Sequence, residues 1–185
     1  MLTQILFFLL VAAVALQRLA EVAVSRRNER QLISIGGRVH AREQMPWMRA
    51  LHASWLVATP VEVLVADRPF VPWLAATALV VFLAGQLLRR AARRALGSRW
   101  TVSIVAIPGA PLVRHGVYAR VRHPNYLGVA LELAALPLVH GAWLTASIAT
   151  LLNVAFLAWR IRSEERALAE RHDATPHRPL VESRA

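Results

Sequence analysis

Long apolar stretches alternate with clusters of arginine along this chain, and this alternation constrains the fold more than any other feature. Of the 185 residues, 56% are hydrophobic, yet the formal net charge is +11. A helix that crosses a membrane needs about 20 largely apolar residues. Leu2–Val24 and Val71–Leu88 meet this requirement, Leu51–Ala66 is shorter, and Tyr126–Trp159 is long enough for two short helices.

The chain is therefore predicted to be an all-α integral membrane protein with about five transmembrane helices. The last two would form a hairpin around Pro137–Gly141. Without an internal repeat or a linker, residues 1–185 are expected to form a single domain, with a frayed tail from about His172. Met1–Val24 has no basic region before its apolar run, so we interpret it as a helix rather than a cleaved signal peptide.

The arginine clusters predict how these helices are oriented, because short cytoplasmic loops carry an excess of Arg and Lys. Loops 25–50 and 89–123, and the segment after Trp159, are rich in arginine. The connections 66–70 and 137–141 contain only Arg68. We therefore expect an external N-terminus and a cytoplasmic C-terminus.

Composition also argues against two kinds of site. The chain has no cysteine, and its seven histidines show neither HxxxH nor HxH spacing, so no metal site is expected. The basic clusters are separated by membrane-length apolar runs and do not alternate with stacking aromatic residues. Binding to nucleic acid is therefore not expected.

The polar segments with the most chemical content lie at the two ends of the predicted hairpin. The first is Gly116–Gly128 (GVYARVRHPNYLG) and the second is Arg160–Leu168 (RIRSEERAL). Pro124 suits the first turn of a helix, where its missing N–H has no intrahelical partner. The hairpin would return both segments to one membrane face. Mixed charges that converge there suit a zwitterionic ligand with an amine and a carboxylate.

Two polar residues are expected within the hairpin itself. Glu132 follows Asn125 by seven residues on one helix face, and Asn153 precedes Arg160 by seven, so Glu132 and Asn153 should meet at one level. Intramembrane carboxylates are costly and often functional. Glu132 is therefore either a catalytic candidate or a packing residue that hydrogen-bonds Asn153 or a Trp N–H. Gly128 on the same face allows close helix contact or leaves room for a ligand.

The first helix carries a polar stripe that should face the bundle, where it would serve packing or line an acceptor channel. Arg18 can pair with Glu21 at i+3. His52 and Trp55 near the end of the second helix are interpreted as membrane-interface residues. The stripe consists of Gln17, Glu21, Ser25 and Asn28.

The RHPxYxG motif at 122–128, the apolar hairpin and the segment Arg160–Leu168 together resemble the isoprenylcysteine carboxyl methyltransferase family of integral membrane enzymes. A narrower resemblance is to the short bacterial branch found beside type III polyketide synthases, whose members methylate alkylpyrones or alkylresorcinols. It rests on RLAE at 18–21, SRRN at 25–28, GG at 36–37, LH at 51–52, RWT at 99–101 and IPG at 107–109.

The resemblance implies a cytoplasmic pocket for S-adenosyl-L-methionine within residues 97–171 and a catalytic role for Arg160, which would orient the oxygen nucleophile. Glu132 is the second catalytic candidate, from its position in the hairpin. The cofactor pocket would use residues of both polar segments, namely Arg122, His123, Pro124, Tyr126, Gly128, Glu164 and Glu165.

The expected activity is O-methylation of a lipophilic acceptor at the bacterial plasma membrane, with membrane lipid around the bundle and a type III polyketide synthase as a partner. An alternative activity is carboxyl methylation of isoprenylcysteine or a lipid. Two further alternatives are a membrane reductase of the sterol reductase type, which would need a nicotinamide site and a longer bundle, and a non-catalytic membrane partner of a lipid-synthesis enzyme.

Overall fold

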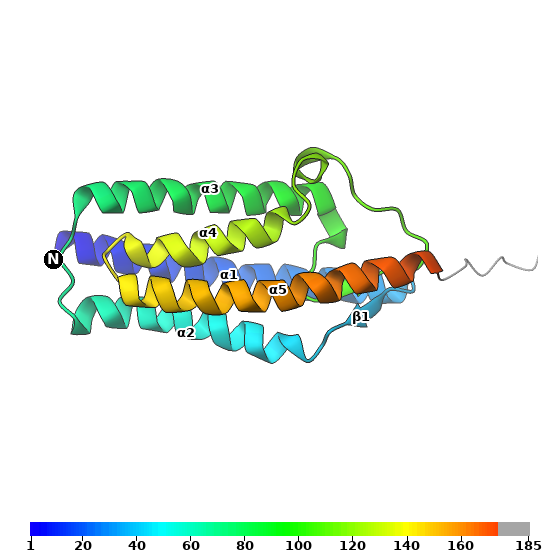
Figure 1. Cartoon of the computed structure of the whole chain (residues 1–185), viewed down its shortest axis with the longest axis horizontal. Coiled ribbons are helices and arrows are strands. Elements are labelled where there is room, and N and C mark those ends of the chain that lie inside the picture. Colours follow the sequence, from blue (N-terminus) through cyan, green and yellow to red (C-terminus); the bar gives the residue numbers. More distant parts are fainter. Residues whose placement is uncertain (174–185) are drawn as a thin grey trace, which may run out of the picture.

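The computed structural model describes residues 1–173, in which five α-helices run roughly along one direction (Figure 1). The short α2–α3 and α4–α5 connections lie at the end of the bundle that holds the N-terminus (Figure 1). The long α1–α2 and α3–α4 connections lie at the other end. The helices are α1 (Leu2–Ser34), α2 (Gln44–Val65), α3 (Pro72–Leu96), α4 (Pro124–Leu138) and α5 (Trp143–Asp173).

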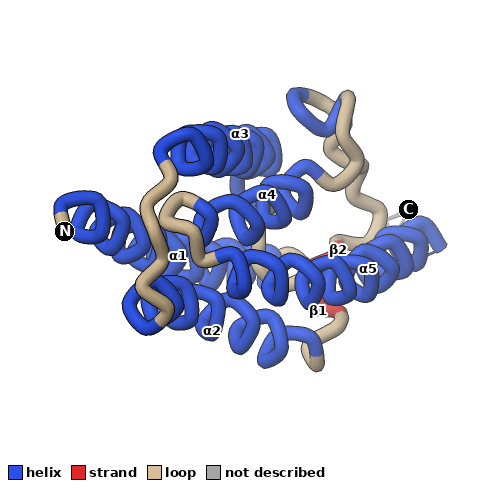
Figure 2. Tube along the Cα trace, turned by 60° about the vertical axis from the view of Figure 1, so that its left-hand side comes forward, coloured by secondary structure: helices blue, strands red, loops and turns tan. Residues whose placement is uncertain are grey.

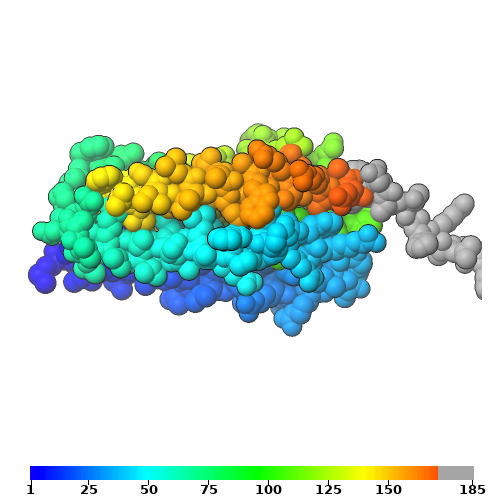
Figure 3. Space-filling view, turned by 60° about the horizontal axis from the view of Figure 1, so that its bottom comes forward, coloured from blue at the N-terminus to red at the C-terminus, as the bar shows by residue number. Residues whose placement is uncertain are grey.

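These helices confirm the prediction of a helical membrane fold. Three of the described helices are long and apolar enough to cross a membrane, namely α1, α3 with the turn that follows it, and α5. Helix α2 contains Pro60, and α4 has only 15 residues. Seen from the face in Figure 3, α5, α2 and α1 lie side by side in that order. The structure describes the chain as far as residue 173. The tail expected from about His172 therefore lies outside the described residues from 174 onward.

The helices extend beyond their apolar segments, and this corrects the expected loops. Helix α1 continues past Val24 to Ser34, and α3 continues past Leu88 to Leu96. Arg26, Arg30 and Arg89 were expected in loops but lie on these helical extensions. Arginine is a good helix former, so a helix need not end where its apolar run ends.

A small sheet closes the end of the bundle opposite the N-terminus, and the all-α prediction missed it. Strand β1 (Arg38–His40) pairs antiparallel with β2 (Ile104–Ala106), with Val39 opposite Val105. Ile104 and Ala106 pack against Ala167 of α5. Figure 2 shows the two strands beside the C-terminal half of α5. The sheet therefore joins the two long connections and fixes them against α5.

Helix α4 is held by its neighbours at a proline and at a glycine. Pro137 has no N–H, so the carbonyl of Leu133 lacks its usual helical donor. The indole Nε1 of buried Trp55 on α2 donates to this carbonyl at 3.1 Å. A Cβ on Gly128 would lie 2.9 Å from the carbonyl oxygen of Gly85 on α3. Gly128 is thus a close-packing residue, as one of its two interpretations predicted.

The contacts of Glu62 explain how this acidic residue fits into the apolar α2 segment. It lies near the end of α2, where its carboxylate accepts hydrogen bonds from the backbone N–H groups of Leu144 at 3.1 Å and Thr145 at 2.6 Å. Arg68 pairs with the same carboxylate at 3.1 Å. Glu62 therefore satisfies free N–H groups at the start of α5 and joins the two short connections.

Candidate functional site

A cavity of about 1110 Å³ lies between the helices and the long connections. Pockets for one small ligand usually measure about 300–1,000 Å³, so this cavity has room for more than one molecule. Its walls come from α1, α2, α3, α4 and α5 and from the segment between Arg99 and His123. Charged residues line the cavity at the α4 N-terminus, whereas the part between α1, α2 and α5 combines apolar side chains with Arg18, Glu21 and Asn153.

The α4 N-terminus and α5 bring opposite charges together, as the sequence predicted. Pro124 is the first residue of α4. His123 Nε2 lies 3.4 Å from Glu165 Oε1, and His123 Nδ1 lies 3.8 Å from Glu164 Oε2. Arg122 Nη2 lies 3.2 Å from Glu165 Oε1, although its side chain is 81% exposed. This cluster offers carboxylates to a cation and an exposed guanidinium to an anion.

Two tyrosines add aromatic surface to the same part of the cavity. The Tyr126 ring stacks on His123 with centroids 5.6 Å apart. Burial raises the pKa of the Tyr118 phenol, and the nearby charge of Glu164 raises it further. The Tyr118 phenol therefore remains neutral and keeps an O–H donor. Tyr118, Tyr126 and His123 all line the cavity and could pack against a planar ring.

Arg160 lies in the wall between the charged and the apolar parts of the cavity. Its side chain is only 4% exposed, and its Nη2 donates to the carbonyl of Val102. The guanidinium carbon lies 5.8 Å from the centroid of the Tyr126 ring. Nη1 is buried and has no hydrogen-bond partner among the described residues. One donor of Arg160 is thus available to a ligand.

Several buried polar atoms on the cavity wall likewise lack partners within residues 1–173. They include the Asn125 Oδ1, one oxygen of Glu164, and both amide atoms of Asn153. Buried polar groups are nearly always hydrogen-bonded, and leaving one unpaired costs about 1–3 kcal/mol. A polar ligand or ordered water in the cavity could pair with these atoms.

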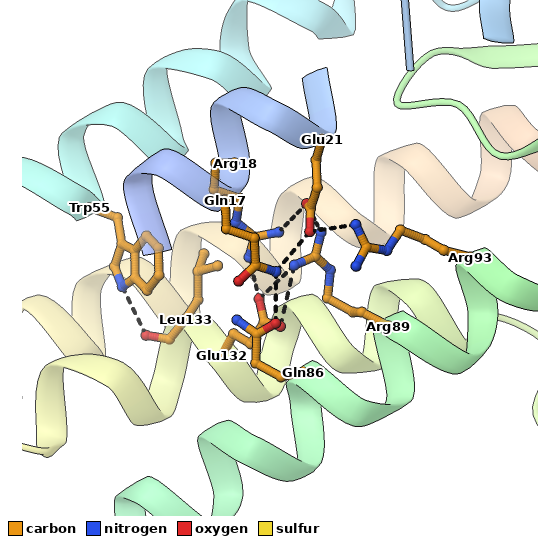
Figure 4. A network of polar contacts seen from close by, with 9 residues as sticks. All are labelled: Gln17, Arg18, Glu21, Trp55, Gln86, Arg89, Arg93, Glu132 and Leu133. Carbon is orange, nitrogen blue, oxygen red and sulfur yellow. Dashed lines mark hydrogen bonds and ion pairs between the residues drawn. The ribbon is translucent and has the colours of Figure 1, made fainter. Parts of the chain in front are cut away.

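Figure 4 shows a buried network of ions between α1, α3 and α4, and three of its members, Arg18, Glu21 and Arg89, line the cavity. Glu21 of α1 is approached by Arg18 at 3.2 Å, by Arg93 at 2.9 Å and by Arg89. Glu132 of α4 accepts from Arg89 at 3.0 Å and from Arg18. The predicted Arg18–Glu21 pair is confirmed. Three arginines and two glutamates leave one net positive charge in this network.

The predicted contact between Glu132 and Asn153 is wrong. Glu132 is fully buried and bound by Arg18 and Arg89, while Trp55 donates to the carbonyl of Leu133 instead. Glu132 does not line the cavity within the described residues, whereas Asn153 does. Two arginines offer stronger, charge-assisted hydrogen bonds than one amide, which explains the different pairing. A catalytic role for Glu132 stays a prediction.

The remaining predicted site residues divide into two groups. Six line the cavity, and two support its wall. Pro124 and Gly128 belong to the second group because they lie in the packed start of α4, where Gly128 contacts Arg89 and Gly85. The six lining residues are Arg122, His123, Tyr126, Arg160, Glu164 and Glu165.

Sequence reasoning missed the part of the network on α3 and the contribution of residues 100–105 to the cavity wall. Gln86, Arg89 and Arg93 follow i, i+3 and i+7, so a polar face was visible once the helix was continued past Leu88. Gln17 Nε2 donates to Gln86 Oε1 at 2.8 Å, which links this face to the predicted stripe on α1. The contribution of residues 100–105 to the wall had no local signal in the sequence.

Comparison with known proteins identifies the family. The profile of the isoprenylcysteine carboxyl methyltransferase family matches residues 77–170, which include α4, most of α5 and the charged cluster. The chain is 34% identical to a Bacillus subtilis protein named "Uncharacterized protein YpbQ" over 89% of this chain and 98% of that protein.

More distant relatives carry a named activity. Mouse "Protein-S-isoprenylcysteine O-methyltransferase" is 28% identical over 64% of this chain and 42% of its own length. A solved structure of a eukaryotic intramembrane Ras methyltransferase of this family superposes with a TM-score of 0.55 at 28% identity, over 68% of this chain and 46% of that one. The chain thus spans less than half the length of these two relatives. It is a multi-pass helical membrane protein and belongs to the isoprenylcysteine carboxyl methyltransferase family.

Proposed function

We propose that this protein is an S-adenosyl-L-methionine-dependent O-methyltransferase that acts on a lipophilic acceptor. The observation that carries the proposal is one continuous cavity with charges of both signs at one end and many apolar side chains of α1, α2 and α5 in its other part. The named activity of the mouse relative supports the reaction class. The acceptor we propose is an alkylpyrone, an alkylresorcinol or a related polyketide lipid.

The charged end of the cavity fits the polar parts of the cofactor. Glu164 and Glu165 would hold its amine, with His123 fixing both carboxylates. Arg122 would bind its carboxylate, and Asn125, whose Oδ1 has no partner in the described part of the chain, could bind a ribose hydroxyl or an adenine amine. Tyr118 and Tyr126 offer faces for the purine. Residues 97–171 would thus form the cofactor-binding part of a single domain.

The bound cofactor would supply an electrophilic methyl group on a sulfonium. The protein has to align the acceptor oxygen with it and exclude water, which is largely a matter of positioning. Arg160 lies where the two parts of the cavity meet, and its free Nη1 can hold the acceptor oxygen. A fixed cation there favours the deprotonated form of that oxygen.

The other end of the cavity fits an acyl or alkyl chain. It is lined by side chains of three helices, which would let the tail of the acceptor remain in an apolar environment while its head reaches Arg160. The apolar residues are Ala15, Leu19 and Val22 on α1, Ala53 and Leu56 on α2, and Phe156 and Leu157 on α5.

The proposed orientation in the membrane follows from where the substrate and the cofactor are found in the cell. We place the N-terminus outside and the C-terminus in the cytoplasm of a bacterium, because the cofactor is cytoplasmic and the arginine-rich end of the bundle carries the charged cluster. A type III polyketide synthase in the same cell is the proposed source of the acceptor.

The test is cofactor binding and methyl transfer by the purified protein in lipid nanodiscs. We expect calorimetry to detect adenosylmethionine and not NADPH, and mass spectrometry to detect methylated alkylpyrone or alkylresorcinol. Methylation of an S-prenylcysteine alone would favour the carboxyl methyltransferase activity of the mouse relative. Binding of NADPH alone would favour a reductase, and binding of neither would favour a non-catalytic role.

A further inference from the structure

His52 lines the cavity, and the proposed mechanism does not use its chemistry. It lies on α2 between Met48 and Leu56, at i−4 and i+4, and all three residues line the cavity. Its Nδ1 lies 2.9 Å from the carbonyl oxygen of Met48. A carbonyl oxygen can only accept, so Nδ1 must carry a proton. In the neutral ring this leaves the lone pair on Nε2.

The Nε2 of His52 has no hydrogen-bond partner among the residues that the structure describes. Arg18 of α1, Arg89 of α3 and Arg160 of α5 line the same cavity. Arg18 and Arg89 are both paired with Glu21 and Glu132. Arg160 has no carboxylate partner among the ion pairs of the described residues, and its Nη1 is an open donor there. Burial and these cations favour the neutral ring of His52, so its Nε2 lone pair can accept a hydrogen bond in the same cavity as a fixed cation.

Asn153 adds a second unsatisfied group to this inner part of the cavity. Its side chain is 1% exposed, and neither amide atom is hydrogen-bonded within the described chain. It precedes Arg160 by about two helical turns on α5, so both residues can face one ligand. Together the three residues offer a lone pair, a cationic donor and an amide that can both donate and accept.

This set of groups selects among acceptors. A carboxylate is already ionised and has no proton to give, and its oxygens would face the lone pair of His52. A phenol or enol with a neighbouring oxygen uses every group: its O–H meets His52, and its second oxygen meets Asn153. The arrangement thus fits a hydroxyl better than a carboxylate.

We propose that His52 removes the proton of an acceptor hydroxyl during methyl transfer, while Asn153 and Arg160 hold the same head group. This inference rests on the proposed methyltransferase function. The O–H bond breaks as its proton passes to Nε2, and the oxygen electron pair forms the new O–CH3 bond. The C–S bond of the cofactor breaks, its electrons stay on sulfur, and His52 then releases its proton to water.

The experiment compares acceptors of different acidity with His52→Ala and His52→Gln in nanodiscs. The glutamine can still donate to the Met48 carbonyl but cannot take a proton, so it preserves the local fold. Ser54→Ala is the matched control, because Ser54 is exposed on the same helix. The acceptors are an alkylresorcinol, a more acidic 4-hydroxy-6-alkylpyrone and an S-prenylcysteine. Adenosylmethionine binding is measured for every variant.

We expect both His52 variants to lower kcat/KM for the alkylresorcinol by roughly 10²–10⁴-fold, the usual contribution of a general base. The loss should be smaller for the pyrone, because its more acidic enol O–H needs less help from a base, and cofactor affinity should stay unchanged. Normal resorcinol transfer by both variants, or equal losses for both hydroxyl acceptors, would overturn the role of His52 and leave the methyltransferase intact.

Assays of the wild-type protein distinguish a failure of the His52 inference from a failure of the proposed methyltransferase function. Transfer to the S-prenylcysteine alone would overturn the hydroxyl inference while supporting a methyltransferase. A wild-type protein that neither binds adenosylmethionine nor methylates any of the three acceptors would overturn the proposed function, and the role of His52 with it.

Discussion

Asn153 and Arg160 lie about two turns apart on α5, and both hold buried polar atoms without a partner in the described chain on the wall of one cavity. Such atoms reduce stability unless a ligand satisfies them. A polar ligand in the cavity could pair with both groups, while Arg160 also donates to the Val102 carbonyl and so helps to hold the 100–105 segment.

This relationship predicts opposite effects of Asn153→Leu on stability and on activity. Leucine has a similar size and removes the unsatisfied amide, so the free energy of unfolding should rise by about 1–3 kcal/mol. The KM for the acceptor should rise at least tenfold. Thermal unfolding in detergent and a methyl-transfer assay check both effects. Loss of stability with unchanged KM would show that Asn153 has a hidden structural partner.

Glu165→Gln and His123→Ala should weaken adenosylmethionine binding and leave the fold intact. Glu165 lies 3.4 Å from His123 and 3.2 Å from Arg122 at the cavity edge, away from the apolar core. Loss of one charge-assisted hydrogen bond should cost about 1.5–3 kcal/mol, or roughly tenfold to more than a hundredfold in affinity. Calorimetry measures the change, and wild-type affinity in both variants would contradict the assignment.

Arg160→Ala should abolish turnover without abolishing cofactor binding, since Arg160 is placed at the junction with the acceptor. Arg160→Lys keeps the charge but cannot both donate to Val102 and present a second donor from a planar group, so it should stay impaired. Turnover and adenosylmethionine affinity have to be measured together. If turnover falls only as far as cofactor binding does, Arg160 holds the cofactor or the 100–105 segment.

Glu132→Ala should act mainly on stability, because it leaves Arg18 and Arg89 buried with one carboxylate fewer. Removal of one partner from a buried ion pair typically costs about 3–5 kcal/mol. Thermal unfolding checks this value against Glu43→Gln, a change at an exposed position on the N-terminal side of α2. A stable Glu132→Ala protein that binds cofactor but has no turnover would instead support the catalytic role.

Reporter fusions test the orientation of the bundle. A fusion at residue 68 should be external, and a fusion at Ala185, which lies outside the described residues, should be cytoplasmic. Arg68 pairs with Glu62, so the α2–α3 connection carries little net charge to hold it in the cytoplasm. A cytoplasmic signal at residue 68 would contradict this orientation, because the charged cluster at the opposite end of the bundle would then face away from the cytoplasmic cofactor.

The sequence predicted the charged cluster because its geometry depends on one local unit. His123 and Glu165 lie at the open ends of a helical hairpin, and any tight turn near Gly141 brings them together. The network around Glu21 depends instead on how α1, α3 and α4 pack. The i+3 spacing was enough to predict the Arg18–Glu21 pair. The contacts of Arg89 could be predicted only if α3 was continued as a helix beyond its apolar run.

Two other features had too weak a local signal for prediction. Strands β1 and β2 have three residues each, too few for a period-2 pattern, and they come from two connections that lie far apart in the sequence. The pairing of Glu132 with arginines was missed because the hairpin was considered alone. Within the hairpin Asn153 was the polar partner expected for Glu132, whereas the arginines that bind Glu132 come from α1 and α3.

The hydrogen bond from Trp55 to the Leu133 carbonyl makes Trp55 and Pro137 energetically coupled. An alanine at 137 would restore a helical N–H that competes for the same oxygen. Loss of the Trp55 indole should therefore cost less stability when Pro137 is also replaced. A double-mutant cycle should give a non-zero interaction energy, and during divergence of related chains each of these two positions would influence which residues the other tolerates.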